Sequence, residues 1–497
     1  MRVKSILFIL LAAALSGGCL HEELHPVDIY YTADVQGFYW SRMEPRFENK
    51  EAGGYAVLKN FLQTRPAPYL LFDGGNWFGS APEGNLTKGA YVAELTKTIP
   101  YTAGSVSDKD LVYGWPSLRN TVRELPYPFI VSNLKLEGKI PWPMHDYQIR
   151  TVDGIKIGIF GLIDPQTINK NKGRLLGLTA QDPVQVAKDM ASLLREKGVD
   201  FIIVLSALGE EQKDGVSDAS LAGEVEHLGL ILSANKDREN AETDTVNNTF
   251  IVYPGSKLDS IGHIRLLFDK NKQVREVKFE DIPLFKEEFG EDEEIASRAA
   301  ALRADTRKKM NARVADMPQP VATSLTAESP LGDLLAQCLY KWSKLDGAII
   351  NSDSIRNALP EGRVTEYDLY KTYPYGDNIT FITIKGAAFL KALEDSLNAK
   401  DNFPQVAGFT VSYAVTQEGK KIRQVVLEKN GRTVNPRETY RFAVTDHVLA
   451  GGFGHDGFID SLGFKNTFVE ARQIMRSCLV RQKTVELPKL GRWKKVK

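Results

Sequence analysis

The sequence predicts an α/β protein with two sizeable domains. Between residues 27 and 285, apolar runs typical of buried strands alternate with helical stretches, which is the pattern of layered α/β structure. A second region of this kind follows from about 320 to 480, and a length of 497 residues leaves room for both. Lys and Arg total 63, as do Asp and Glu, so the chain lacks the basic excess of proteins that bind nucleic acid, and we expect no nucleic-acid partner.

Individual runs of the first region predict individual elements. Ile155–Leu162 predicts a buried strand, and Pro183–Lys197 has the apolar spacing of an amphipathic helix. The apolar run from Phe201 predicts the next strand, and the runs at Phe250 and Ile261 predict the strands that close the domain.

The stretch 286–317 between the two regions is strongly charged, with acids at its start and bases at its end, and Pro318 follows it. This polarity suits the helix dipole, so we expect a solvated inter-domain helix. A disordered charged linker is the alternative. The last residues, 481–497, are expected to form a basic tail.

Residues 1–19 resemble an export signal. Two early basic residues precede an apolar run from Ile6 to Leu15, which is too short to span a membrane and ends in small residues before Cys19. This ending is close to a bacterial lipoprotein box, so we expect export to the periplasmic side of a bacterial envelope and lipid attachment at Cys19. Ordinary cleavage that leaves an unmodified thiol is the alternative. Cys338 and Cys478 either form a disulfide in that compartment or stay as buried thiols.

Five apolar strands of the first region end in polar residues. The first begins at Val27 and ends in Asp34-Val35-Gln36-Gly37. The others end at Asp73–Asn76, Ser107–Lys109, Ser206–Ala207 and Ala234–Asp237. Because open α/β sheets hold their ligands at the carboxyl ends of strands, we expect these five tips to meet in one crevice.

The order and spacing of these tips resemble the calcineurin-like metallophosphatase domain of the 5'-nucleotidase family, which includes the periplasmic UDP-sugar hydrolases. The resemblance implies a four-layer β-sandwich flanked by helices over residues 27–285, followed by the family's second α/β domain over 320–480. It also implies a pair of divalent metal ions (Mn, Zn or Mg) that activate water and neutralise the phosphate of a nucleotide.

Most of the family's metal ligands are changed in this chain. The family's first three tips end in Asp-x-His, Gly-Asp and Gly-Asn-His-Glu, and the last two contain Ser-His and Gly-His-x-His. Here Asp34 remains, but Gln36 takes the place of the histidine, and Asn76, a neutral amide, takes the place of the bridging carboxylate. The histidines of the last two tips are replaced by Ala207, Asn235 and Asp237.

The third tip, Asp108-Lys109, stands where the family has a metal-binding asparagine and the histidine that protects the leaving group, so both residues are catalytic candidates. Asp34, Asn76 and Asp237 form a weak, degenerate metal set of oxygen ligands. Two dications about 4 Å apart repel each other by roughly 15 kcal/mol at an effective dielectric of about 20, and this set offsets little of that. Two interpretations stay open: a cleft in which Lys109 holds an anion without hydrolysing it, and a surface that has drifted out of use.

The second region keeps more of the family's motifs. They are Leu331–Ala336, Asn351–Arg356, Tyr373–Asn378, Phe403–Phe409 and Asp446–Gly454. The resemblance implies that Asn351 and Arg356 hold nucleoside and phosphate groups, and that Tyr375 and His447 sandwich the base. Phe453 replaces an aspartate that contacts the ligand in the family, which leaves the purine preference open.

Two hypotheses of function follow. The resemblance implies an exported, metal-dependent phosphoesterase of nucleotide catabolism. The changed ligands favour a catalytically inactive envelope lipoprotein that binds a nucleoside- or nucleotide-like ligand or a protein partner. Metal binding by the purified protein discriminates between them.

Overall fold

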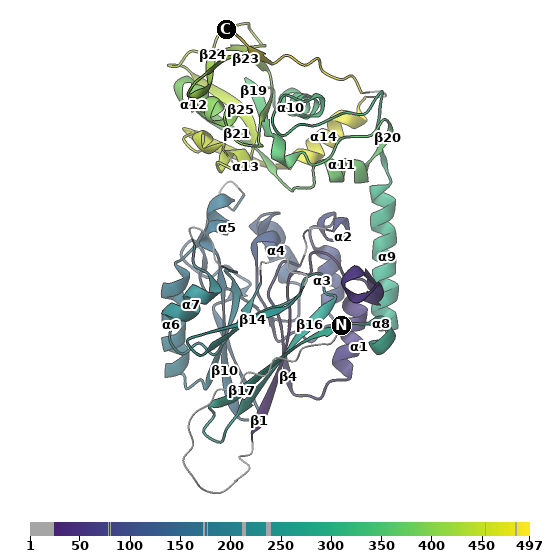
Figure 1. Cartoon of the computed structure of the whole chain (residues 1–497), viewed down its shortest axis with the longest axis vertical. Coiled ribbons are helices and arrows are strands. Elements are labelled where there is room, and N and C mark those ends of the chain that lie inside the picture. The colour runs from purple at the N-terminus through teal and green to yellow at the C-terminus, as the bar shows by residue number, and fades with distance from the viewer. Residues whose placement is uncertain are drawn as a thin grey trace. The chain divides into compact units, whose positions relative to one another are not determined.

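The computed structural model describes residues 24–497, except 78, 80, 172–173, 176, 211–214, 235–239, 453 and 483–484. The chain forms two compact units (Figure 1). The first comprises the chain up to Ile168 and Gly177–Thr306, and the second comprises Asn169–Leu176 and Arg307–Lys497. Both contain sheets covered by helices, which confirms the predicted α/β class.

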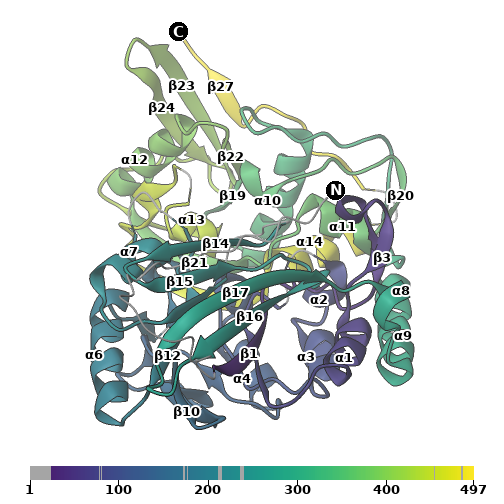
Figure 2. The same ribbon diagram turned by 60° about the horizontal axis from the view of Figure 1, so that its bottom comes forward.

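Two sheets form the centre of the first unit. The seven-stranded sheet has the order β17 (Val274–Pro283), β16 (Ser260–Phe268), β1 (His25–Thr32), β4 (Tyr69–Asp73), β5 (Ala103–Gly104), β6 (Phe129–Ile130) and β8 (Met144–His145). The six-stranded sheet has the order β14 (Glu242–Val246), β15 (Thr249–Tyr253), β13 (Leu230–Ser233), β12 (Phe201–Ala207), β10 (Ile155–Ile163) and β9 (Tyr147–Val152). Figure 2 shows β17, β16 and β1 side by side, as their antiparallel pairing requires.

Successive side chains of a strand point to opposite faces of its sheet, and those that point inward form the core between the two sheets. Val27, Ile29 and Tyr31 of β1 pack in one cluster with Ile203 and Leu205 of β12. The next residues of β12, such as Val204, face the other way and pack with α6 (Pro183–Glu196) and α7 (Asp218–Glu224). On the opposite side, β1 packs against α1 (Tyr55–Gln63). The result is the helix–sheet–sheet–helix layering expected for this unit.

Shorter elements complete the first unit. They are β2 (Arg42–Glu44), β3 (Lys50–Ala52), β7 (Leu134–Leu136), β11 (Leu178–Ala180), α2 (Pro82–Asn85), α3 (Ala90–Thr96), α4 (Trp115–Val122), α5 (Pro165–Lys170) and α8 (Lys286–Phe289). The stretch predicted as one linker helix, 286–317, contains α8, the longer α9 (Glu293–Met310) and then a strand, β18 (Arg313–Met317). The boundary between the units falls within α9.

The second unit contains a five-stranded sheet and a three-stranded sheet. The larger sheet has the order β22 (Pro404–Ala407), β19 (Gly347–Asn351), β25 (Thr439–Thr445), β21 (Asn378–Lys385) and β26 (Gly463–Glu470). The smaller has the order β24 (Gly419–Leu427), β23 (Phe409–Thr416) and β27 (Trp493–Lys495), so the stretch predicted as a basic tail ends in a paired strand. β18 pairs with β20 (Gly362–Thr365).

Helices cover both faces of the five-stranded sheet. α10 (Pro330–Ser343) and α14 (Ala471–Val480) pack on one face, and α12 (Gly386–Leu397) packs on the other. The remaining helices of this unit are α11 (Glu366–Thr372) and α13 (Asp446–Leu449). Cys338 of α10 and Cys478 of α14 form a disulfide, one of the two outcomes the sequence left open.

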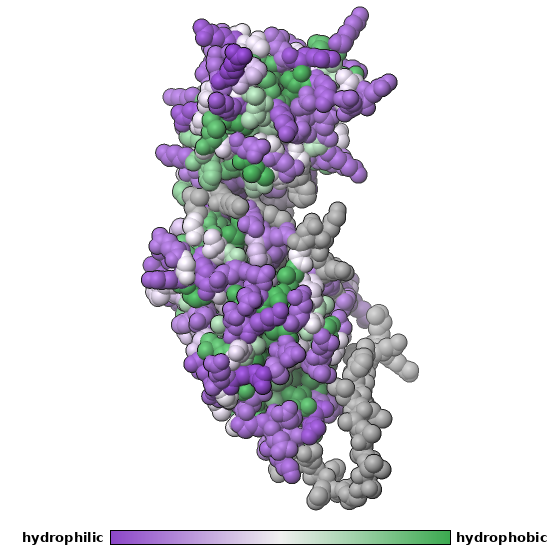
Figure 3. Space-filling model, turned by 90° about the vertical axis from the view of Figure 1, so that its left-hand side faces the viewer, coloured by the Kyte–Doolittle hydropathy of each residue, from purple (hydrophilic) through white to green (hydrophobic). Residues whose placement is uncertain are grey.

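One face of the molecule is shown in Figure 3. It is mostly hydrophilic, and its hydrophobic residues lie in small groups between hydrophilic ones. Among the helices that the structure describes, none combines the length and the apolar character needed to cross a bilayer.

Candidate functional site

Strand tips of the two sheets meet in the first unit, as the sequence predicts. β1, β4 and β5 run parallel in one sheet, and β12 and β13 run parallel in the other. The Tyr31 hydroxyl at the end of β1 donates to the Ser233 carbonyl at the end of β13 at 2.7 Å. Gly74, just after β4, lies so close to Ala33 and Ala234 that a Cβ built there would come within 3.0 Å of both methyl groups. The tips of three strands are therefore in contact.

The backbone at these tips is unusual. Asp34, Gln36 and Asn76 have positive φ angles of 52°, 55° and 58°, which non-glycine residues rarely adopt. Two main-chain bonds hold this geometry: Asp34 N–H donates to the Gly75 carbonyl at 2.9 Å, and Gln36 N–H donates to the Asn76 carbonyl at 2.8 Å. Such strained positions persist only where the surroundings fix them, and they concentrate at functional sites.

Asn76 connects Asp34 to the third tip. Its Nδ2 donates to Asp34 Oδ1 at 2.6 Å, and its Oδ1 accepts from the Lys109 main-chain N–H at 2.9 Å. The Lys109 side chain runs beside Gly79, which also lies near the backbone of Gln36. The structure thus brings together four of the predicted site residues: Asp34, Asn76, Asp108 and Lys109.

The buried carboxylates of Asp110 and Asp73 hold the strand tips in this arrangement through hydrogen bonds. Asp110 accepts from the main-chain N–H groups of Asn76, Trp77 and Ser107 at 2.6, 2.9 and 3.0 Å, which fixes the second and third tips to each other. Asp73 accepts from the Thr32 hydroxyl at 2.7 Å. Burial raises the pKa of Asp73 and of Asp110 to about 7 in each case.

Burial also raises the pKa of Asp108, although the Lys109 ammonium beside it acts in the opposite direction. Asp108 and Lys109 therefore interact electrostatically. The role of either in catalysis is still a prediction.

Asp218 at the start of α7 was missed by sequence reasoning. Its carboxylate accepts from the hydroxyls of Ser206 at the end of β12 and Ser233 at the end of β13, and burial raises its pKa to about 6. The fourth and fifth tips are therefore joined by a carboxylate that no strand-tip motif contains. The only sequence signal was Ser217 before Asp218, a residue type that commonly caps helices.

The contacts of Asn76 do not fit a two-metal centre. The Lys109 N–H can only donate, so Asn76 Oδ1 faces it and the amide NH₂ faces Asp34. An amide NH₂ offers no lone pair to a metal, and a neutral group does not offset the repulsion of two dications. Among the residues that the structure describes, no three His, Cys, Asp or Glu side chains are arranged to hold a metal ion.

Several predicted residues lie outside the described part of the chain. They are Cys19, Asn235, Asp237 and Phe453. The predicted lipidation site and the fifth-tip metal ligand therefore stay predictions. His263 on β16 agrees with the expectation of an ordinary packing role, because its ring stacks on Tyr30 with ring centroids 4.7 Å apart.

The predicted ligand residues of the second unit lie at one edge of its five-stranded sheet. Parallel strands β19 and β25 end at Asn351 and Thr445, and the antiparallel β21 begins beside them at Asn378. Thr445 Oγ1 donates to Asn351 Oδ1 at 3.2 Å, and Asn351 Nδ2 donates to Ser354 Oγ at 2.6 Å. The Asn351 side chain is therefore fixed from both ends.

Tyr375 and His447 differ in their surroundings. Arg356 donates Nε to the Tyr375 hydroxyl at 2.7 Å, and its guanidinium lies 5.4 Å from the ring centroid. Tyr375 is 38% exposed, so part of its side chain is accessible to a ligand. His447 Nε2 lies 3.8 Å from Asp353 Oδ2, and its ring lies directly against Gly452. A side chain at position 452 would collide with this ring.

Two buried carboxylates at the same edge were not predicted as site residues. Asp377 Oδ2 accepts from the Tyr373 hydroxyl at 2.7 Å, and Asp446 contacts Asn378 Nδ2 at 3.4 Å. Both also bind Arg174, a residue that the sequence gave no reason to select.

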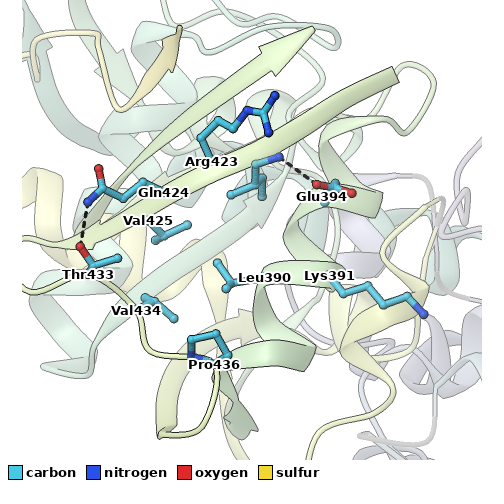
Figure 4. A pocket seen from close by; sticks show the side chains of 10 residues that line it. Leu390, Lys391, Glu394, Arg423, Gln424, Val425, Thr433, Val434 and Pro436 are labelled. Atoms are coloured by element: carbon cyan, nitrogen blue, oxygen red, sulfur yellow. Dashed lines mark hydrogen bonds between the residues drawn. The ribbon is translucent and has the colours of Figure 1, made fainter. Parts of the chain in front are cut away.

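A cavity of about 330 Å³ lies elsewhere in the second unit, between α12 and β24 (Figure 4). Its polar wall groups are partly used within the wall: Glu394 accepts from the Ile422 main-chain N–H at 2.8 Å, and Gln424 Nε2 donates to Thr433 Oγ1 at 2.8 Å. Leu390, Val425, Val434 and Pro436 supply its apolar lining. It includes none of the predicted ligand residues.

Comparisons with known proteins agree with both units. Residues 311–460 match the sequence model of the 5'-nucleotidase C-terminal domain. The chain is 21% identical to a 5'-nucleotidase of Vibrio vulnificus, over 95% of this chain and 93% of the relative. A Staphylococcus aureus protein assigned to the 5'-nucleotidases superposes with a TM-score of 0.72 at 18% identity, covering 95% of this chain and 100% of that one.

A 5'-nucleotidase precursor from Thermus thermophilus superposes with a TM-score of 0.64 at 20% identity, covering 95% of this chain and 99% of that one. At these identities the structures show the shared fold alone. The domain match and the similarity to 5'-nucleotidases over nearly the whole chain agree with the resemblance drawn from the strand tips: residues 311–460 form a 5'-nucleotidase C-terminal domain, and the chain as a whole is similar to 5'-nucleotidases.

Proposed function

We propose that this protein is an exported member of its family that binds a nucleotide-like ligand through the second unit and does not hydrolyse it with two metal ions. One observation carries the second part of the proposal: the Asn76 amide donates to Asp34 at the position where the family has a bridging carboxylate. A two-metal mechanism needs anionic ligands at that point, because the metals must be held against their mutual repulsion.

The ligand-binding part rests on the second unit. A partly exposed tyrosine ring offers a stacking face, and stacking of a base on an aromatic ring contributes about 1–3 kcal/mol. The Arg356 guanidinium beside that ring is a donor for phosphate oxygens, since its planar fork matches their geometry. Asn351 lies buried at the same sheet edge and is held there by its own hydrogen bonds.

Export to the bacterial envelope is part of the same proposal. The apolar leader that ends at Cys19 supports it, with a lipid on that cysteine as the membrane anchor. The disulfide between Cys338 and Cys478 supports it independently, because disulfides persist mainly in oxidising compartments.

Hydrolysis with an altered ligand set is the second candidate, favoured by relatives that are 5'-nucleotidases. Phosphate release from AMP and from a panel of phosphoesters, with Mn²⁺, Zn²⁺ or Mg²⁺ added, separates the two. We expect no turnover. Turnover that Asp34→Ala abolishes would establish hydrolysis and refute the proposal.

Nucleotide binding is tested by calorimetric titration of AMP into the wild type and three variants. Arg356→Ala and Tyr375→Ala are expected to weaken binding at least about tenfold, which corresponds to about 1.4 kcal/mol. Tyr367→Ala is the matched control, because Tyr367 is a similarly exposed tyrosine of the same unit that stacks with Lys371 instead. Equal affinities in all four proteins would contradict the site.

A further inference from the structure

A buried arginine occupies an acidic recess in the second unit. Arg174 belongs to the segment Asn169–Leu176, which clusters with this unit although the rest of the unit begins at Arg307. Its Nε and Nη2 donate to the two carboxylate oxygens of Asp446 at 2.8 and 2.9 Å, and Nη2 also lies 3.3 Å from Asp377 Oδ1. Arg174 is 6% exposed, and both carboxylates are buried.

This contact has the geometry of specific guanidinium recognition. Two parallel N–H groups meet the two oxygens of one carboxylate, and a second carboxylate accepts from the side. Burial acts to lower the pKa of Arg174, but the two carboxylates outweigh it and raise the pKa above its usual value. The guanidinium therefore stays charged, and a lysine, with its single ammonium, would not reproduce the fork.

The recess is polar on its other sides as well. The Tyr373 hydroxyl and Ser354 Oγ both approach Asp377 Oδ2, at 2.7 and 3.4 Å. These neutral donors and one guanidinium face two carboxylates, so the recess requires a cation. Removing Arg174 leaves two buried charges without their counter-charge.

The recess also joins two loops of the proposed ligand site. Asp377 comes two residues after Tyr375, and Asp446 comes directly before His447. A guanidinium that holds both carboxylates therefore fixes the distance between the backbones that carry the two rings.

We propose that Asp377 and Asp446 form a guanidinium-binding recess whose resident ligand is Arg174, and that occupation of this recess positions Tyr375 and His447. Arg174 is thus a positioning residue. The second half of this proposal rests on the proposed nucleotide binding, and the first half does not.

The first test measures the Tm of the Arg174→Ala protein with and without millimolar methylguanidine. We expect the Tm to fall by roughly 10 °C and methylguanidine to restore it saturably. Methylammonium, with the same charge but no fork, is expected not to restore it. Arg313→Ala, which removes an exposed arginine paired with Asp316, is the control and is expected not to respond to methylguanidine.

Three outcomes of this test would refute the proposal that Asp377 and Asp446 form a guanidinium-binding recess. They are an unchanged Tm in Arg174→Ala, an equal methylguanidine response in Arg174→Ala and Arg313→Ala, and a rescue by methylammonium as large as that by methylguanidine. If Arg174→Ala does not fold, Arg174→Lys is measured instead. A Tm below that of the wild type supports specific recognition of the guanidinium group, and a Tm equal to that of the wild type refutes it.

The second test measures AMP affinity in the same proteins. We expect Arg174→Ala to bind AMP about tenfold more weakly, and methylguanidine to restore the affinity. Rescue of the Tm with unchanged AMP affinity would refute the positioning role alone. A wild type that does not bind AMP would refute the proposed function and the positioning role. The Tm measurements would still show whether the recess binds a guanidinium group.

Discussion

Replacing Asn76 by aspartate tests the interpretation of the crevice most directly. The variant places a carboxylate oxygen where Nδ2 now lies, 2.6 Å from Asp34 Oδ1. Two unit charges 4 Å apart repel by about 4 kcal/mol at an effective dielectric of about 20, and the lost hydrogen bond adds about 1 kcal/mol. Without metal, Asn76→Asp should therefore be less stable than the wild type by about 4–5 kcal/mol at pH 8, a large part of the stability of a typical domain.

Two conditions should relieve this repulsion. Lower pH protonates one of the paired carboxyls, whose pKa is raised in the folded state, so the stability of the variant should increase as the pH falls. A divalent cation binds between the two carboxylates instead. At a Mn²⁺ concentration one hundred times its Kd, binding adds about 2.7 kcal/mol.

The assay is urea unfolding of the wild type and Asn76→Asp, with and without Mn²⁺. Asn133→Asp is the matched control, because Asn133 is also fully buried in this unit but its Nδ2 donates to the Ile163 carbonyl and not to a carboxylate. We expect Mn²⁺ to stabilise Asn76→Asp and neither of the other two proteins. Equal stabilisation of the wild type would show that its crevice already binds the metal and would refute the reasoning.

Two further predictions concern stability. Burial raises the pKa of Asp73 from 3.8, the usual value of an aspartate, to about 7, so between these pH values Asp73 binds a proton in the folded state that the unfolded chain releases. Asp73 should therefore contribute a fall in stability as pH rises from about 4 to about 7, by up to about 1.4 kcal/mol per pH unit, and no further fall above that. Asp110 and Asp218, whose pKa values are also raised, add to the slope, so Asp73→Asn should reduce the slope in urea titrations by this amount without removing it, and an unchanged slope would contradict the assignment. The disulfide closes a sequence separation of 140 residues, which in the chain-entropy model contributes about 5 kcal/mol. Dithiothreitol and the double substitution Cys338→Ser, Cys478→Ser should lower the Tm of the protein equally, and a Tm insensitive to the reductant would argue against the bond.

Much of the fold could be predicted because its strands are buried on both faces. Ile155–Leu162 and the run from Phe201 read as continuous apolar segments, and β10 and β12 lie at these places. The third tip is less regular than predicted. β5 ends at Gly104, and Ser107 then precedes a short helix, Asp108–Leu111, in which the Asp110 carboxylate accepts from the Ser107 main-chain N–H. Such local side-chain bonds compete with strand pairing and do not appear in an apolar pattern.

The long-range polar contacts could not be predicted. Arg174 and Asp446 are 272 residues apart in the chain, and Asp218 meets two serines that come from separate strands. Motif spacing identifies residues that lie together in one loop, as with Asn351 and Arg356. It has no information on which distant side chain supplies the counter-charge of a buried carboxylate, because that depends on the packed structure.

The second and third tips are connected in the structure through Asn76. The Lys109 main-chain N–H donates to Asn76 Oδ1, and this bond orients the amide so that its NH₂ meets Asp34. The same residue brings a positive side chain next to Asp108, whose burial otherwise disfavours its charge. By the resemblance, Asn76 stands in place of a carboxylate, which would remove one negative charge, and Lys109 in place of a histidine, which would add a positive one. Both changes would reduce the need for a dication at the crevice.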